Sequence, residues 1–260
     1  MDYIYRRSIV TFVDVLGFRE FVQSSPSSEI GELISVLKDV SAGDTEHGPI
    51  RAGSSESLAF SDNVVRVCPV DTESRIGALY YELKALVYVQ SAAIDQGVFL
   101  RGGVTIGDVF FDLDREIVFG PALNRAFEIE STLANYPRIV VDPEVLIAHA
   151  NEPALRGGAH DLSLDSKYIG ELITKGDDQL QFVDYLRSSK QDIEEMEFSY
   201  SEFLENHRNK ILANVRKGGV IDRVRQKYLW LSAYHNKTVQ KQIPKTDWSS
   251  LLIEDKDLGF

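Results

Sequence analysis

The spacing of hydrophobic positions predicts alternating strands and helices over most of the chain. Residues 8–13 are β-branched and aromatic, which is typical of a buried strand. Between 75 and 96, apolar residues recur every three or four positions, as they do in a helix with one buried face. Residues 41–56 are rich in glycine and serine and predict a loop. The same approach predicts a helix from Ser25-Pro26, a hairpin of 57–60 and 64–68, strands at 98–111, 116–119, 138–141 and 180–186, and helices at 122–134 and after Asp142-Pro143.

The pattern changes towards the C-terminus. Residues 151–180 predict loops, and from about Lys190 the chain becomes charged and helical, at 190–216 and 220–240. This order of elements predicts an α+β fold, a sandwich in which helices cover one face of a mostly antiparallel sheet. We therefore expect a first domain at 1–187 and a C-terminal helical extension at 188–260.

Composition narrows the classes of partner and compartment. The chain has 260 residues and a net charge of -12, which argues against binding to nucleic-acid backbones. No apolar run reaches bilayer length, and Asp14 interrupts the short apolar stretch near the start, so we expect neither a membrane span nor a signal peptide. The single cysteine, Cys68, cannot form an intramolecular disulfide, and this favours a cytoplasmic location.

Two aspartates stand where a metal ion could bind. Asp14 ends an apolar strand before a Gly-Phe turn, and Asp62 lies at the predicted hairpin tip. Carboxylates on neighbouring strands could hold Mg²⁺ or Mn²⁺, which prefer oxygen ligands. The turn after Asp14 offers backbone N–H groups to phosphates. The alternative is structural, because aspartate is common at strand ends and in Asp-Asn turns.

Four segments, taken in order, resemble the class III nucleotidyl cyclases. No single segment is diagnostic, but the ordered set covers about residues 8–131. The resemblance implies the cyclase variant of a ferredoxin-like sandwich and a head-to-tail homodimer with active sites at the interface. The matching segments are Phe12-Val13-Asp14-Val15-Leu16-Gly17-Phe18, Phe60-Ser61-Asp62-Asn63, Arg101-Gly102-Gly103-Val104-Thr105-Ile106-Gly107, and Gly120-Pro121-Ala122-Leu123-Asn124 followed by Glu130-Ser131.

The resemblance also implies roles for individual residues. Two Mn²⁺ or Mg²⁺ ions would be held by Asp14, Asp62 and the backbone of Val15. The implied catalytic residues are Asp14, Asp62 and Asn124, with Asn124 coming from the partner chain. The implied substrate-binding residues are Gly17, Phe18, Phe60, Arg101 and Asn124.

Three departures from the family pattern bear on the substrate. Leu58 and Ile117 stand where purine cyclases carry the lysine and aspartate that read the base, and Glu128 replaces the arginine that stabilises the transition state. Arg125 could stand in for that arginine, but on a helix it points elsewhere. A cyclase with these departures resembles the pyrimidine cyclases of bacterial Pycsar antiphage defence, as does the segment 227–236.

That resemblance implies conversion of UTP to 3′,5′-cyclic UMP and pyrophosphate, with the product acting on a separate effector. CTP and cyclic CMP are the alternative. Arg101 is the candidate reader of a pyrimidine carbonyl, or it covers a sheet edge or pairs with a surface acid. Two further hypotheses stay open, namely a catalytically inactive nucleotide-binding or interaction module and a purine cyclase that reads its base differently.

Overall fold

The computed structural model describes residues 3–42, 55–71, 77–156, 161–216 and 222–259. One sheet runs through the molecule, with strand order β2-β3-β1-β4-β6-β8-β7 and β5 paired to β4. The strands are β1 (Arg6–Val15), β2 (Glu56–Phe60), β3 (Asn63–Pro69), β4 (Leu100–Asp112), β5 (Ile117–Phe119), β6 (Ile139–Val141), β7 (Ile173–Lys175) and β8 (Gln181–Val183). The α-helices are α1 (Phe18–Ser24), α2 (Ser27–Ala42), α3 (Ala78–Asp95), α4 (Pro121–Glu128), α5 (Pro143–Asn151), α6 (Leu162–Leu172), α7 (Tyr185–Ser188), α8 (Lys190–Glu195), α9 (Tyr200–Arg216), α10 (Asp222–Gln242) and α11 (Trp248–Leu251).

Pairing within this sheet confirms the predicted α+β fold with a mostly antiparallel sheet. The β1 strand lies antiparallel between β3 and β4, and the β4–β6 pair is parallel. In the register of β1, Asp14 lies opposite Asn63 on β3 and Arg101 on β4. Three segments that are distant in sequence therefore lie side by side at the ends of the central strands.

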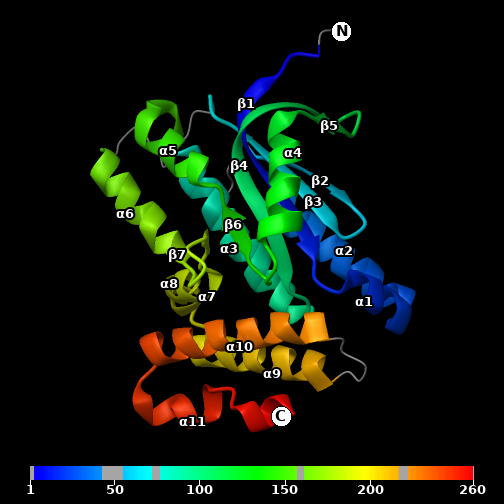
Figure 1. Cartoon of the computed structure of the whole chain (residues 1–260), viewed down its shortest axis with the longest axis vertical. Coiled ribbons are helices and arrows are strands. Elements are labelled where there is room, and N and C mark those ends of the chain that lie inside the picture. The colour runs from blue at the N-terminus through cyan, green and yellow to red at the C-terminus, as the bar shows by residue number, and fades with distance from the viewer. Residues whose placement is uncertain (1–2, 43–54, 72–76, 157–160, 217–221, 260) are drawn as a thin grey trace.

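Helices cover both faces of the sheet, which corrects the expectation of one covered face. The α2 and α3 helices pack on one face, where Ile9 and Val13 are buried, and α4 packs on the other against Val10 (Figure 1). Apolar side chains of β1 thus point in both directions. The α4 helix packs closely on β4, and the absence of a side chain at Gly103 makes this possible. A Cβ at Gly103 would lie 2.5 Å from the Ala126 carbonyl oxygen.

The C-terminal helices form a layer across one end of the sheet (Figure 1). The α9 and α10 helices pack against each other, and α9 also contacts α3. Leu204, Ile211 and Leu231 are fully buried and belong to the same hydrophobic core as β1 and α3. The predicted helices at 190–216 and 220–240 are confirmed within the described residues. The first is divided into α8 and α9, and positions 217–221 lie outside the described part.

Other predicted elements need adjustment. The 151–180 segment contains α6 and β7 in place of loops alone, and α1 precedes the helix predicted from Ser25-Pro26. The predicted helix at 122–134 passes into a π-helix at Ile129–Leu133. The predicted 41–56 loop lies largely outside the described residues. No described helix has both the length and the hydropathy needed to cross a bilayer.

A buried row of polar groups connects this C-terminal layer to the sheet. The Tyr185 hydroxyl lies 2.7 Å from His207 Nε2, and His207 Nδ1 lies 3.0 Å from His235 Nδ1. His235 Nε2 lies 2.9 Å from the Leu251 carbonyl oxygen. Because a carbonyl accepts only, His235 Nε2 donates and its Nδ1 accepts from His207. His207 Nε2 then accepts from Tyr185, and both rings are neutral.

Candidate active site

The strand ends at the centre of the sheet bring two predicted metal ligands together. Asp14 is the second-last residue of β1, and Asp62 lies in the tight turn between β2 and β3, after Ser61 at φ 58°. The Asp62 carboxyl lies within hydrogen-bonding reach of Asp14 and raises its pKa. Asn63 donates to Asp62 at 3.2 Å and holds the side chain at the turn. Both carboxylates are half-buried.

Arg101 lies between Asp14 and a third acid. Arg101 Nε donates to Asp14 Oδ2 at 2.8 Å, and Arg101 Nη2 lies 2.7 Å from Glu130 Oε1. Glu130 is nearly fully buried on the π-helix that follows α4. Sequence reasoning placed Glu130 in the family pattern but gave it no role in the site. The acidic position at the end of a helix, six residues after Asn124, was the available signal.

The electrostatics of this cluster show a surplus of negative charge. Burial raises the pKa of Asp14 most, Arg101 opposes that rise, and Asp62 adds to it. Burial also raises the pKa of Glu130, which Arg101 and Lys227 of α10 lower and the two aspartates raise further. Three carboxylates thus share Arg101 and Lys227 in a partly desolvated place. A bound cation would relieve this repulsion.

The donor set fits a divalent cation that keeps part of its shell for substrate. Asp14 and Asp62 offer carboxylate oxygens, which Mg²⁺ and Mn²⁺ favour. The ladder between β1 and β3 ends at Asp14–Asn63, so the backbone of Val15 lies beyond that pairing. Among the described residues no group of three or more His, Cys, Asp or Glu side chains is arranged as a complete metal site. Two carboxylates would leave most of the coordination positions of such an ion to other ligands.

The turn after β1 and the tip of the neighbouring hairpin surround the two carboxylates. Gly17 adopts a φ of 75°, a left-handed conformation that favours glycine, and α1 begins at Phe18 immediately afterwards. Phe60, two residues before Asp62, is 79% exposed. An aromatic ring this exposed beside the carboxylates is available to a ligand or to another chain.

Among the described residues, no hydrogen bond joins the Asn124 side chain to Asp14 or Asp62 of the same chain. It is exposed on α4, and neighbouring Ala122 faces Gly107. Six residues separate Asn124 from Glu130, about 9 Å along a helix. Arg125 is held by Asp142 and Glu128, each at 2.9 Å, so it does not point to the carboxylates.

Leu58 and Ile117, which the family resemblance aligns with the purine-reading positions of cyclases, have apolar side chains. Leu58 pairs with Val65 on β3, and Ile117 pairs with Asp112 on β4. Both are half-buried. Neither side chain can donate or accept a hydrogen bond, so a purine edge beside them would stay unpaired.

Solved structures with a similar arrangement of elements include two cyclases and a cyclase-like ATP-binding protein. A bacterial light-regulated adenylyl cyclase superposes with a TM-score of 0.42 at 14% identity, over 55% of this chain and 79% of that protein. The guanylyl cyclase Cya2 gives a TM-score of 0.44 at 14% identity, over 70% and 93%. A class III adenylyl cyclase-like ATP-binding protein from Pseudomonas aeruginosa gives 0.38 at 10% identity, over 64% and 40%.

No protein-family model and no curated protein sequence matches the chain. At sequence identities of 10–14%, the similarity to these solved structures concerns only the arrangement of helices and strands. The chemistry therefore has to come from the side chains of this chain.

Proposed function

We propose that this protein is a metal-dependent nucleotide cyclase that closes the ribose 3′-oxygen onto the α-phosphorus of a nucleoside triphosphate and releases pyrophosphate. The observation that carries the proposal is the meeting of Asp14 and Asp62 at the strand ends. There, burial and mutual repulsion raise the pKa of Asp14. A half-buried carboxylate pair beside a Gly-Phe turn is a suitable place for divalent cations and a triphosphate.

Each part of the chain has a role in this proposal. Asp14, Asp62 and the backbone of Val15 hold the ions. When bound, such ions activate a hydroxyl and offset phosphate charge. The turn at Gly17 and Phe18 orients the phosphates, and Asn124 of the partner subunit orients the ribose.

Removal of Asp62 tests the metal assignment. We expect Asp62→Ala to lose about 4 kcal/mol of transition-state stabilisation, roughly a thousandfold in turnover, because a metal ligand is lost. The turn exposes the side chain in part, so the variant should fold. The measurement is product formation with saturating Mn²⁺, and Asp255→Ala, an exposed aspartate near the C-terminus, is the matched control. Near-normal turnover by Asp62→Ala would refute the assignment.

The dimer is part of the same proposal. Exposed aromatic rings of the N-terminus and the β4–β5 arm pack together, with Tyr3 and Phe119 each 5.0 Å from Phe110 between ring centroids. Phe127 on α4 is 52% exposed. Exposed apolar surface of this extent is typical of an interface between chains. A second copy, placed over α4, would add its Asn124 to the carboxylates.

Mixing two inactive variants tests this shared site. Asp62→Ala and Asn124→Ala homodimers should each be inactive, whereas a mixed dimer has one intact site and should recover part of the activity. Light scattering gives the oligomeric state of the same samples. A fully active monomer, or no recovery after mixing, would contradict a site shared between chains.

We further propose a pyrimidine substrate, with UTP favoured over CTP, and cyclic UMP as a product for a separate effector in antiphage defence. The support is the apolar character of Leu58 and Ile117, because an unpaired polar edge costs about 1–3 kcal/mol per group. Arg101 is the proposed base reader. Its Nε and Nη2 face Asp14 and Glu130, and among the described residues its Nη1 has no carboxylate partner.

One incubation discriminates between the substrates. The protein is given equimolar UTP, CTP, ATP and GTP with Mn²⁺, and the products are separated. Cyclic AMP or cyclic GMP as the main product would overturn the pyrimidine assignment. Unchanged base selectivity in Arg101→Ala would remove Arg101 from the base pocket while leaving the cyclase proposal intact.

A second candidate function is an inactive, cyclase-like binding module. The observation that favours it is Glu128 in place of the transition-state arginine, with Arg125 held by two acids. An absence of product from all four nucleotides, combined with Mn²⁺-dependent nucleotide binding, would support this alternative.

A further inference from the structure

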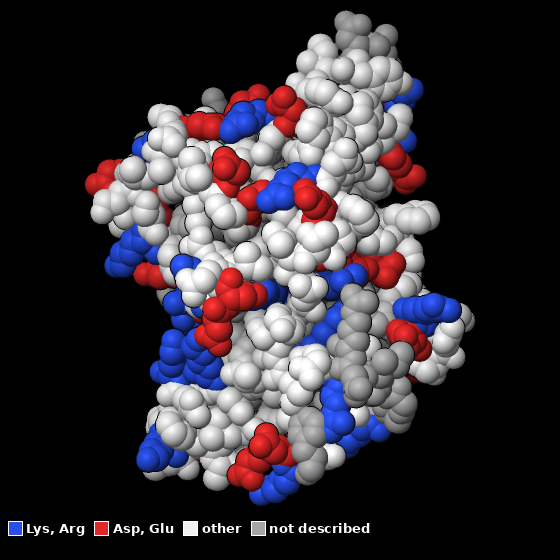
Figure 2. Space-filling model, viewed as in Figure 1, with Lys and Arg blue, Asp and Glu red and all other residues white. Residues whose placement is uncertain are grey.

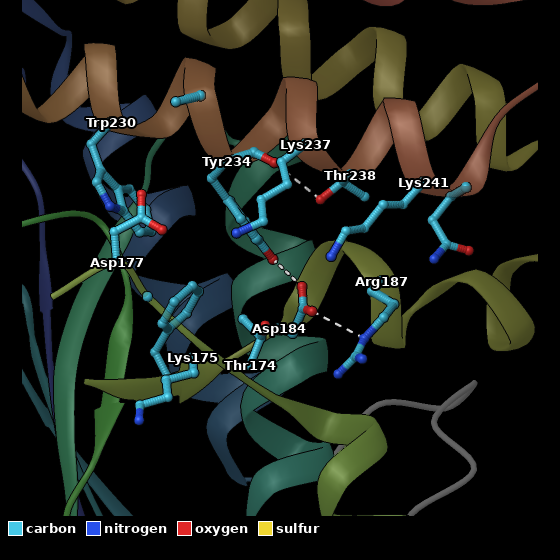
Figure 3. Close-up of a pocket in the computed structure, with 14 residues that line it drawn as sticks. Thr174, Lys175, Asp177, Asp184, Arg187, Trp230, Tyr234, Lys237, Thr238 and Lys241 are labelled. Atoms are coloured by element: carbon cyan, nitrogen blue, oxygen red, sulfur yellow. Dashed lines mark hydrogen bonds and ion pairs between the residues drawn. The ribbon is translucent and has the colours of Figure 1, made fainter. Parts of the chain in front are cut away.

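A cleft lies between α10 and the β7–β8 hairpin, away from the carboxylate cluster. Its volume is about 270 Å³. Phe182 and Trp230 form its apolar wall, and Lys237 and Lys241 extend from α10 towards Asp184 and Arg187 (Figure 3). The two lysines are four residues apart and therefore share one helix face. Nothing in the proposed cyclase chemistry uses this cleft.

The cleft is basic in a strongly acidic protein. Four cationic and two acidic side chains line it, although the whole chain carries a net charge of -12. Figure 2 shows Lys and Arg side chains gathered on this part of the surface, beside the C-terminal half of α10. Like charges crowded in this way repel one another, and an anion is the natural counterpart.

The acids of the cleft leave the lysines unpartnered. Asp184 already accepts from the Tyr234 hydroxyl at 2.7 Å and pairs with Arg187 at 3.0 Å. Arg187 in turn donates through Nη2 to three backbone carbonyls, which fixes it in place. In the described part of the chain, neither Lys237 nor Lys241 forms an ion pair with a carboxylate. Their amines are therefore free to bind a ligand.

We propose that this cleft binds an oligophosphate anion, with Lys237 and Lys241 as its main ligands and Arg187 as a fixed positive charge behind them. Two amines one helical turn apart match an anion that carries several charges along its length. The ligand would bridge α10 and the β7–β8 hairpin, so its binding should strengthen the attachment of the C-terminal helices. The anion is either an inorganic oligophosphate or the phosphate chain of a nucleotide. This inference goes beyond the proposed cyclase and does not depend on it.

Trp230 supplies a direct readout of binding. In the full chain carrying Trp248→Phe, the remaining tryptophan lines the cleft. Inorganic tripolyphosphate is added in EDTA at low salt, a condition that removes metal-dependent binding at the carboxylates. We expect a saturable change in fluorescence and a melting temperature several degrees higher. A nucleoside triphosphate titrated in parallel distinguishes the sources, because tighter binding than tripolyphosphate indicates contacts of the base with the apolar wall.

Charge reversal tests the ligands. Lys237→Glu combined with Lys241→Glu should weaken tripolyphosphate binding at least tenfold. The matched control is Lys38→Glu combined with Lys167→Glu, which makes the same charge change at exposed lysines on α2 and α6 and should stay within twofold. Circular dichroism checks folding, and single Lys→Gln changes replace any variant that misfolds.

Three results would overturn the proposal. These are no saturable response to tripolyphosphate, an equal response to sulfate at matched ionic strength, or an equal loss of binding in the control variant. Each can occur with cyclase activity intact, so failure here is distinguishable from failure of the proposed function.

Discussion

Two clusters of acidic and arginine side chains lie at Thr11 and Asp14 of β1, on opposite faces of the sheet. They differ in the balance between negative and positive charge. On the α3 face, Glu82 accepts from Arg66 through two nitrogens, at 2.9 and 3.0 Å, and from the Thr11 hydroxyl at 2.8 Å. On the α4 face, Arg101 is shared by Asp14 and Glu130, with Asp62 beside them.

The difference shows in the pKa of the acids. Burial raises the pKa of Glu82, but Arg66, Thr11 and Ser55 outweigh burial and leave the pKa lowered. Burial raises the pKa of Asp14 and Glu130, and their arginine does not compensate. Similar residue types thus make a satisfied structural ion pair on one face. On the other they leave a surplus of charge that fits a ligand site.

The largest expected effect is on stability and concerns the α3 face, where Glu82 and Arg66 are paired. Glu82→Gln removes one charge of a buried pair and leaves Arg66 uncompensated, which should cost about 3–5 kcal/mol of unfolding free energy. Urea unfolding measures the loss. Glu32→Gln, an exposed glutamate on α2, is the control and should change little. A cost below about 1 kcal/mol would mean that the pair on the α3 face is not the structural one.

Metal binding should have the next largest effect, and only on the other face. At neutral pH, Mn²⁺ at a hundredfold excess over its dissociation constant should stabilise the protein by about 2.7 kcal/mol. Asp62→Ala should abolish that gain, whereas the Glu32→Gln control should retain it. Thermal unfolding with and without Mn²⁺ gives the comparison. Equal stabilisation of the Asp62→Ala protein would place the ion elsewhere.

The pH dependence of that stabilisation follows from the raised pKa of Asp14. A carboxylate must be ionised to bind the metal, so binding fails as the pH falls through the folded-state pKa. Because that pKa lies above 3.8, the loss begins at a higher pH than for an ordinary aspartate. A dissociation constant for Mn²⁺ that stays constant as the pH falls to 3.8 would contradict the raised pKa of Asp14.

The smallest expected effect has the opposite sign. A raised acid pKa means that the folded state disfavours the ionised form, so stability is present at low pH and is lost as the pH rises through the folded pKa. Asp62→Asn removes charge that raises the pKa of two neighbours, and should stabilise the metal-free fold at pH 7 by about 0.5–1 kcal/mol. Urea unfolding in EDTA measures it. A destabilisation comparable to that of Glu82→Gln would remove the distinction between the two faces.

Sequence patterns were sufficient for the elements that alternate or repeat cleanly. The hairpin with Asp62 at its turn and the strand ending at Asp14 follow from local signals, whereas the register that aligns Asp14 with Arg101 was not predicted. The α6 helix was missed because 151–180 contains Gly and Pro, although Asp161 caps α6 by accepting from Leu164 N and gave a usable signal. The covered second face was missed because the sequence predicts the helix at 122–134 without showing which face of the sheet it packs on.

Side-chain partners were harder to predict than elements. The pairing of Arg101 with Glu130 depends on where the π-helix places Glu130, and a change from α to π geometry has no clear signature in a single sequence. The basic cleft was missed because its lysines and Arg187 come from separate elements, and a lysine pair on a helix normally marks a solvated surface.

The row of groups from Tyr185 to Leu251 fixes how many protons the junction between sheet and C-terminal helices can hold. The hydrogen bond between the two rings runs in one direction, so a proton added to His235 Nδ1 would set it against the Nδ1 donor of His207. Burial lowers the pKa of His235 to about 4, and burial together with the neighbouring His235 holds the pKa of His207 well below its usual value. The neutral rings therefore contribute stability that is complete above pH 6.5 and is lost as the pH falls towards 4, about 3 kcal/mol for His235 alone. Acid therefore weakens the attachment of the C-terminal layer by adding protons to this row.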